Sequence, residues 1–247
     1  MSERELSGLA AIVTGAGKNI GRAIALDLAD GGASVAVVVR ADKKSADSVV
    51  KEIEARGGKA VAVLADIAKQ DDIARMIGET LSHFGRLDIL VNNAGIRPEN
   101  PIEEITLKEW RDVMHVSLEG PFLCVQAALP ELTKHKGTII NIGGLTAYVG
   151  AAHRAHVIAA KAGLDGLTKA LAVELAPRGI TVNLVSPGMI DTQREGADPH
   201  HRKSRTTLLG RRGKPEEVAS MVRYLAGPKG RYLTGQTIHV NGGVFLP

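Results

Sequence analysis

A glycine-rich turn near the N-terminus has the residue types and spacing of a phosphate-binding loop. The turn has the sequence Thr14-Gly15-Ala16-Gly17-Lys18-Asn19-Ile20-Gly21. It follows a short apolar run, Ala11 to Val13, and precedes a helical pattern, Arg22 to Ala29. Small residues let a backbone approach a pyrophosphate, and a helix N-terminus offers free N–H groups and the positive end of its dipole. Glycines also close ordinary turns, but the order of strand, turn and helix predicts a dinucleotide site.

Short β-branched runs alternate with helix-length segments along the whole chain. The predicted strands are Ala11 to Val13, Val35 to Val39, Ala60 to Leu64, Ile89 to Val91, Thr138 to Ile142, Thr181 to Val185 and Thr237 to Val240. Continuous apolar strands are typical of burial on both faces, and strand–helix–strand alternation requires parallel pairing. The sequence therefore predicts an α/β fold, a doubly wound (Rossmann) parallel sheet of seven strands with helices on both faces. Since no linker interrupts the alternation, residues 1–247 are expected to form a single domain.

Composition restricts the classes of function. The 247 residues are 44% hydrophobic and 23% charged, as in ordinary globular domains, whereas aromatic residues, which form stacking platforms for single-stranded nucleic acid, make up only 3%. The single cysteine, Cys124, cannot form an internal disulfide, and the first residues lack an apolar signal segment. No run reaches the ~18 to 20 apolar residues that span a bilayer. We expect a cytoplasmic protein without a nucleic-acid or membrane partner.

The net charge of +4 is concentrated in one segment. Asp191 to Lys214 holds seven basic and three acidic residues and shows no clear helix or strand period. Two interpretations remain open: a mobile basic lid that closes over an anionic ligand, or a solvated loop. His200 and His201 lie in this segment without carboxylates or cysteines arranged around them, so we predict no metal site.

Further motifs follow the predicted strands in order. They are Asp66, Asn92-Asn93-Ala94-Gly95, Asn141-Ile142, Lys161-Ala162-Gly163, Ser186-Pro187-Gly188 and Asn241-Gly242-Gly243. Together with the glycine turn they make the whole chain resemble the short-chain dehydrogenase/reductase family, in the group of the 3-oxoacyl carrier-protein reductases. The middle glycine of the family's turn is replaced by Asn19, a residue type that tolerates positive φ. The resemblance implies a homotetramer and a small-molecule or acyl-thioester substrate.

The end of the second predicted strand indicates the type of cofactor. Enzymes that select NAD place an acid there to bind the ribose 2′-hydroxyl, whereas this chain has Val39 followed by Arg40. Arg40, with Lys18 added by the resemblance, is expected to bind the 2′-phosphate of NADP(H). The alternative is that both are solvated loop charges and that NAD(H) binds. The resemblance implies this cofactor-binding set: Gly15, Gly17, Lys18, Asn19, Ile20, Gly21, Arg40, Asp66, Ile67, Asn93, Ala94, Gly95, Lys161, Pro187 and Gly188.

The resemblance also locates four catalytic positions, of which this chain keeps one. Family members use a tyrosine four residues before a lysine as proton donor, a serine that polarises the substrate oxygen, and an asparagine that holds a relay water. Lys161 is present, but the other three positions hold Val157, Gly144 and Ser117. None of the three tyrosines precedes a lysine by four residues. The ordinary proton donor is therefore missing.

Two other residues are candidates for the missing acid. His153, Val157 and Lys161 are spaced four apart, which would place them along one face of a predicted helix, and imidazole titrates near neutrality. Tyr148 follows the fifth strand, beside the glycines that end it. His156, a quarter-turn from that face, ranks lower. The alternative interpretations are that His153 is a polar residue at the helix start and that Tyr148 is an aromatic side chain of the pocket wall.

Three functions are compatible with this pattern. The first is an NADP(H)-dependent oxidoreductase acting on a carbonyl or alcohol of a 3-oxoacyl-like substrate, with weak or atypical activity. The second is a lyase or isomerase on the same scaffold, since a fold does not fix chemistry. The third is a catalytically silent dinucleotide-binding subunit or sensor.

Overall fold

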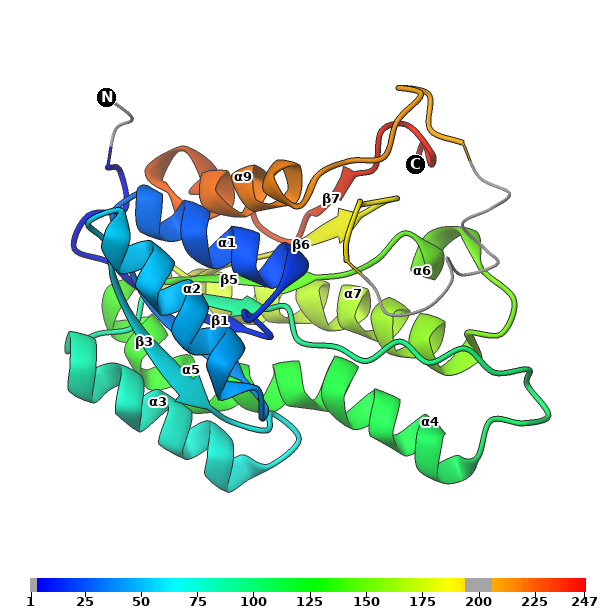
Figure 1. Ribbon diagram of the computed structural model, residues 1–247, viewed down its shortest axis with the longest axis horizontal. Helices are drawn as coiled ribbons and strands as arrows, with labels where there is room; N and C mark the ends of the chain where they lie inside the picture. The colour runs from blue at the N-terminus through cyan, green and yellow to red at the C-terminus, as the bar shows by residue number, and fades with distance from the viewer. Residues whose placement is uncertain (1–3, 194–205) are drawn as a thin grey trace.

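The computed structural model describes residues 4–193 and 206–247, and their strands form one parallel sheet (Figure 1). The strands are β1 Ala10–Thr14, β2 Ser34–Val39, β3 Lys59–Leu64, β4 Ile89–Asn92, β5 Thr138–Ile142, β6 Thr181–Pro187 and β7 Thr237–Val240. Their order in the sheet is β3-β2-β1-β4-β5-β6-β7, and every neighbouring pair is parallel. This confirms the predicted fold class, and the strand order reverses between β1 and β4, where α/β proteins bind ligands.

Helices cover both faces of the sheet (Figure 1). The α-helices are α1 Asn19–Asp30, α2 Lys43–Ala55, α3 Gln70–Phe84, α4 Leu107–Met114, α5 Gly120–His135, α6 Thr146–Val149, α7 Ala155–Leu175 and α9 Pro215–Ala226. A π-helical turn, η1 (His115–Glu119), joins α4 to α5, and η2 (Ala176–Arg178) and η3 (Pro228–Gly230) are 3₁₀ turns. Helices α1, α2 and α9 pack on one face, while α3, α5 and the end of α7 pack on the other.

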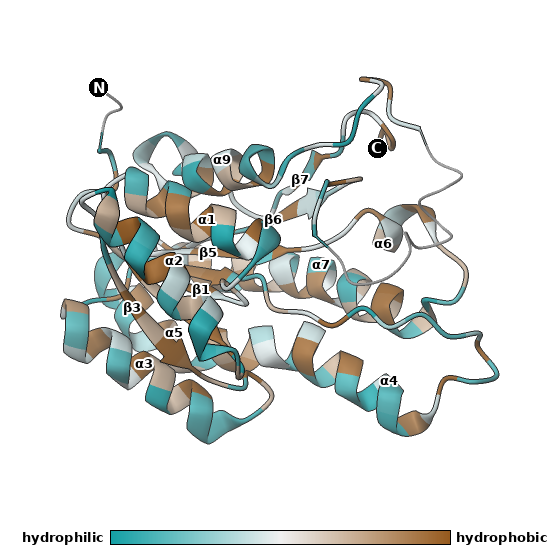
Figure 2. Cartoon of the chain, viewed as in Figure 1, coloured by the Kyte–Doolittle hydropathy of each residue, from teal (hydrophilic) through white to brown (hydrophobic). Residues whose placement is uncertain are grey.

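Alternate residues of the central strands enter the two cores. In β2, Val35 and Val37 belong to the core under α1 and α9, whereas Ala36 and Val38 belong to the core under α3 and α5. Burying each such valine contributes roughly 1.5–3 kcal/mol of transfer free energy, and burial on both faces explains the unbroken apolar run in the sequence. Figure 2 shows hydrophilic residues mainly on the outer surfaces of the helices and apolar residues mainly on the sides that face the sheet.

The ends of the elements differ modestly from the sequence expectation. Every strand agrees with its predicted range to within two residues, and α1 begins at Asn19 rather than Arg22. Asn19 has a φ of 52°, the left-handed value that the sequence led us to expect. Within the described residues, no helix has both the length and the apolar character needed to cross a membrane.

Candidate active site

A cavity of about 420 Å³ opens at the carboxyl ends of β1, β2 and β4. Most of the predicted cofactor-binding residues line it: Gly15, Lys18, Asn19, Ile20, Gly21, Arg40, Asp66, Ile67, Asn93, Ala94 and Gly95. Lys161, Pro187 and Gly188 line a smaller adjoining cavity of about 90 Å³, which shares Asn93 and Gly95 with the first. Gly17 faces α2 instead, where an added Cβ would collide with the Ser45 side chain.

The turn after β1 is held rigidly against the end of β4. Asn93 donates its side-chain amide to the carbonyl oxygens of Thr14 (2.9 Å) and Gly15 (3.0 Å), and Thr14 Oγ1 accepts from the backbone N–H of Asn93 and Ala94. A Cβ at Gly15 would lie 2.9 Å from Ala94 Cα, so this approach requires glycine. The N-terminus of α1 has no side-chain cap and no acid in its first turn. Uncapped N–H groups at such a terminus suit a pyrophosphate.

Asn19 does more than tolerate the turn geometry. Its side-chain amide donates to Gln193 O (3.0 Å), and its Oδ1 accepts from Gln193 N–H (2.9 Å). The residue in place of the family's middle glycine therefore ties the segment after β6 to the cavity that the turn lines. This tether could not be predicted from the sequence, because the two residues are 174 positions apart.

Asn19→Gly is expected to release this tether while leaving the left-handed turn unstrained. Losing an exposed hydrogen bond costs about 1 kcal/mol, so the Gln193 amide should exchange with solvent about five-fold faster. Hydrogen exchange followed by NMR measures this. Asn19→Asp is the matched control, because its carboxylate still accepts from Gln193 N–H. Equal protection of Gln193 in the parent and in Asn19→Gly would show that the tether is absent in solution.

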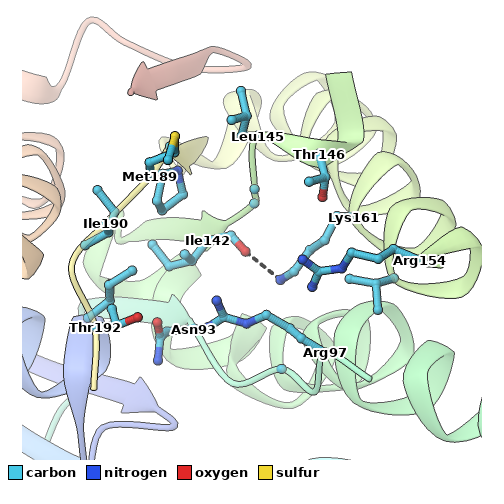
Figure 3. Close-up of a pocket in the computed structure, with 17 residues that line it drawn as sticks. Asn93, Arg97, Ile142, Leu145, Thr146, Arg154, Lys161, Met189, Ile190 and Thr192 are labelled. Carbon is cyan, nitrogen blue, oxygen red and sulfur yellow. Dashed lines mark hydrogen bonds between the residues drawn. The ribbon is translucent and has the colours of Figure 1, made fainter. Parts of the chain in front are cut away.

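Lys161 lies in the adjoining cavity, two turns inside α7 (Figure 3). The residue is only 8% exposed, and Nζ donates to Ile142 O at 2.6 Å. Burial, and secondarily the positive charge of Arg97, lower the pKa of Lys161 from 10.5 to about 7. The amine is therefore poised to gain or lose a proton near neutral pH.

The three replaced catalytic positions surround Lys161. Val157, 3% exposed, lies one helical turn before it and lines the same cavity as Gly144, around which a Cβ would meet no atom within 4 Å. Ser117 lies in η1, fully buried, and its Oγ has no hydrogen-bond partner among the described residues. A Cβ on Gly95 would lie 3.6 Å from Ser117 Oγ and 3.8 Å from Lys161 Nζ, so both groups face one point. π-Helical turns of this kind are frequent at functional sites.

The prediction that His153 shares a helical face with Lys161 is wrong. α7 begins at Ala155, and His153 precedes its N-cap, Arg154, with an exposed side chain and a φ of 62°. Left-handed backbone at His153 ends any helical continuation toward the N-terminus, so the four-residue spacing has no structural meaning there. His153 is also absent from the described lining of the Lys161 cavity.

Tyr148 lies on α6, but its hydroxyl is directed to another partner. The hydroxyl donates to Asp165 Oδ1 at 2.9 Å, and the ring packs on His239 and Phe245 with centroid distances of 4.7 and 5.7 Å. Burial and the neighbouring Asp165 raise the pKa of Tyr148 to about 12, against the hydrogen bond from Thr237. The structure does not bring this hydroxyl to the cavity around Lys161.

Two arginines outside the predicted site also line the Lys161 cavity. Arg97 lies two residues after Gly95, and Arg154 is the N-cap residue of α7. The Arg154 side chain is only 5% exposed, with Nη1 3.6 Å from Glu99 Oε1. The sequence offered one indication of their role, which is that they lie near the motifs at Asn92 to Gly95 and Lys161 to Gly163. Neither arginine belongs to a segment with helix or strand periodicity.

Metal ligation was not predicted, and residues 4–193 and 206–247 hold no group of three or more histidine, cysteine or acidic residues that could bind a metal. The predicted lid, Asp191 to Lys214, is described only at 191–193 and 206–214, so its centre, including His200 and His201, lies outside the described residues. In the described part, Arg211 pairs with Glu217 at 2.7 Å rather than extending as an unpaired charge.

Sequence comparison finds relatives that match nearly the whole chain. Residues 15–245 match the family model described as Enoyl-(Acyl carrier protein) reductase. The chain is 44% identical over 240 residues to the 3-oxoacyl-[acyl-carrier-protein] reductase FabG of Staphylococcus aureus, which covers 96% of this chain and 98% of the relative. It is 43% identical to the 3-oxoacyl-[acyl-carrier-protein] reductase of Synechocystis sp., covering 98% of each chain.

Solved structures give the same result. A dehydrogenase/reductase from Sinorhizobium meliloti superposes with a TM-score of 0.94 at 42% identity, covering 99% of this chain and 98% of the other. A short chain dehydrogenase from Burkholderia cenocepacia, in complex with NADP, superposes with a TM-score of 0.92 at 37% identity, covering 97% and 99%. Together with the glycine turn, the cavity that it lines and the buried Lys161, these matches show that the chain belongs to the short-chain dehydrogenase/reductase family, among proteins similar to the 3-oxoacyl-[acyl-carrier-protein] reductases.

Proposed function

We propose that the protein is an NADP(H)-dependent oxidoreductase acting on the carbonyl or alcohol of a 3-oxoacyl-like substrate. The observation that carries this proposal is the pair of adjoining cavities that runs from Lys18 and Arg40 to Lys161. Relatives support it: two similar proteins, including one 38% identical with a TM-score of 0.91, were solved with NADPH or NADP, and the S. aureus relative is named a 3-oxoacyl reductase.

The residues present fit the cofactor along its length. Lys18 and Arg40 offer two cations for the 2′-phosphate, and the uncapped start of α1 suits the pyrophosphate. Asp66, which the resemblance assigns to the adenine, lines the same cavity. Bound NADP(H) supplies or accepts a hydride. Lys161, held by Ile142 O, is positioned for the nicotinamide ribose, a role that does not need the missing tyrosine.

We further propose that the activity is weak or atypical. The Val157 side chain has no ionisable proton, and Gly144 has no side chain to donate a hydrogen bond. General acid catalysis, which accelerates such reactions about 10²–10⁴-fold, is therefore not available from these positions. Water, the substrate or another residue must supply the proton. A catalytically silent subunit or sensor is the second candidate. It is favoured by one observation: among the described residues, no tyrosine lines the cavity around Lys161.

NADPH is expected to bind at least about ten-fold more tightly than NADH, because a charge-assisted contact to the 2′-phosphate is worth roughly 1.5–3 kcal/mol. Arg40→Asp should abolish or reverse this preference. Calorimetric titration of both proteins with both cofactors measures it, and Lys51→Asp, an exposed position on α2, controls for the same change in net charge. Equal affinities for both cofactors in the parent would contradict the proposed specificity. Oxidation of NADPH in a carbonyl screen then separates an oxidoreductase from a silent subunit.

The proposal extends to the partners. The names of the reductase relatives favour an acyl-thioester or related small-molecule substrate. A homotetramer is supported by apolar side chains left exposed on two long helices, Phe122 on α5 (45%) and Val173 on α7 (79%). Such residues are candidates for burial between subunits.

A further inference from the structure

The amine of Lys161 lies in its cavity with a single hydrogen bond (Figure 3). Among residues 4–193 and 206–247, Nζ donates to Ile142 O alone, at 2.6 Å. A carbonyl oxygen accepts a proton and offers none, so the lone pair of a neutral amine must point away from Ile142 O. The lone pair and the second N–H of the neutral amine are therefore left for a group in the cavity.

The surroundings of Lys161 favour this neutral, nucleophilic form. Burial, and secondarily the charge of Arg97, lower the pKa of Lys161 to about 7. At pH 7 such an amine is neutral on the order of 10³ times more often than one with the ordinary pKa of 10.5. A lysine that is desolvated beside another cation is the type that attacks carbonyl carbons and forms imines.

The cavity offers room for a carbonyl compound and a hydroxyl group beside the amine. Gly144 has open space where a Cβ would project, and Val157 presents an apolar surface. Ser117 Oγ is fully buried and has no hydrogen-bond partner among the described residues. Since Ser117 Oγ and Lys161 Nζ lie 3.6 and 3.8 Å from the position of a Cβ on Gly95, the hydroxyl and the amine face the same point.

We propose that Lys161 is the nucleophile of a second activity, in which Nζ of the dinucleotide-free protein forms an imine with a small neutral ketone or aldehyde. The lone pair of Nζ attacks the carbonyl carbon, and the electron pair of the C=O π bond moves to the oxygen. The two amine protons then leave with that oxygen as one water molecule, and the C=N bond forms. Ser117 Oγ assists by passing a proton from the nitrogen to the oxygen. The step consumes neither an oxidant nor a reductant.

This activity goes beyond the proposed function, because hydride transfer needs the dinucleotide whereas the imine needs Nζ to be free of it. An imine draws electrons from the bond beside it, which is a first step of lyase and isomerase chemistry on carbonyl compounds. If the nicotinamide ribose contacts Nζ as proposed, a bound dinucleotide and the imine exclude each other. The two activities then compete for Lys161.

Trapping with butanone and sodium cyanoborohydride at pH 7 tests the proposal. The reagent transfers a hydride to the carbon of the C=N bond and fixes the adduct as a secondary amine, which mass spectrometry of proteolytic peptides locates. In the dinucleotide-free protein we expect Lys161 to be labelled at least about ten-fold faster than the exposed lysines, because a larger fraction of its amine is neutral. Saturating NADP⁺ should suppress labelling at Lys161 and leave the exposed lysines unchanged.

Matched variants make the result specific. Lys161→Met and Lys161→Arg should both lose the fast labelling, although the arginine keeps a positive charge. Lys169→Met, which removes an exposed lysine of the same helix, should leave the labelling of Lys161 unchanged. Ser117→Ala should slow labelling at least about ten-fold, because the proton transfer loses its hydroxyl. Ser186→Ala is its control, since it removes an equally buried, unpartnered hydroxyl on β6 that is absent from the described lining of the cavity.

Labelling of Lys161 no faster than that of the exposed lysines would overturn the proposal, and an unchanged rate in Ser117→Ala would overturn the role of its hydroxyl. The outcomes also separate this activity from the proposed function. Fast labelling in a protein that binds no dinucleotide refutes the cofactor assignment alone. Fast labelling that persists under bound NADP⁺ refutes the ribose contact alone, whereas tight NADPH binding with slow labelling of Lys161 refutes the imine alone.

Discussion

Val157→Tyr combined with Gly144→Ser is expected to accelerate NADPH-dependent reduction of activated ketones at least about 100-fold over the parent, the lower end of what a positioned general acid contributes. Position 157 lies one helical turn before Lys161, so a tyrosine hydroxyl there would lie near a cation that stabilises its ionised form. At position 144 the added side chain meets no atom within 4 Å of its Cβ. NADPH oxidation under saturating cofactor measures the gain.

The control is Val157→Phe with Gly144→Ser, which adds the same ring without the hydroxyl and should show little of the gain. Val157 packs against Val113 and Ala160, and enlarging such a position costs about 1–3 kcal/mol, so thermal unfolding must confirm that each variant is folded. Ser117→Asn should add less, because it only organises water. A folded, NADPH-binding double variant without a gain would mean that the pocket has been rebuilt for another chemistry.

The sheet could be predicted from the sequence because burial on both faces dictates its pattern. A strand such as β2 must be apolar at every position to fill two cores, and no helix needs such a short unbroken β-branched run. The residues of the cofactor cavity could be predicted from the sequence for a related reason. Parallel strands end at the same edge, so the glycine turn, Arg40, Asp66 and Asn93 had to meet there.

The chemistry around Lys161 was only partly predictable, because loops position it. His153 has the spacing of a helical residue, yet α7 begins after Arg154, which supplies no side-chain cap that would have indicated a start. Arg97 and Arg154 come from two segments without periodicity, and only the folded chain shows that they line one cavity. Gly17 matched a phosphate-loop pattern, but its lack of a side chain serves packing against Ser45.

Lys161→Met is expected to make the protein more stable than the parent, by an amount that depends on pH. The buried amine has a pKa of about 7 in the folded protein and an ordinary value of 10.5 when exposed. Below about pH 7 both states of the parent carry the proton, so the full cost of burying the cation opposes folding. Between the two pKa values the unfolded chain binds a proton that the folded protein lacks, and the parent becomes more stable as pH rises. The variant has no such group.

The gap between those pKa values corresponds to a cost of burying the charged amine of at most about 5 kcal/mol. Lys161→Met also loses the hydrogen bond to Ile142 O, which reduces the gain in stability by about 1 kcal/mol. We therefore expect an advantage of about 2–4 kcal/mol at about pH 6 that falls toward zero or reverses near pH 10. Denaturant unfolding across this range measures it, with Lys169→Met, an exposed lysine of the same helix, as control. Arg97→Gln should raise the pH at which the parent's stability begins to increase, because it removes a positive charge that lowers the pKa of Lys161. A pH-independent difference between the parent and Lys161→Met would show that the Lys161 amine is solvated in the folded protein and that burial does not lower its pKa.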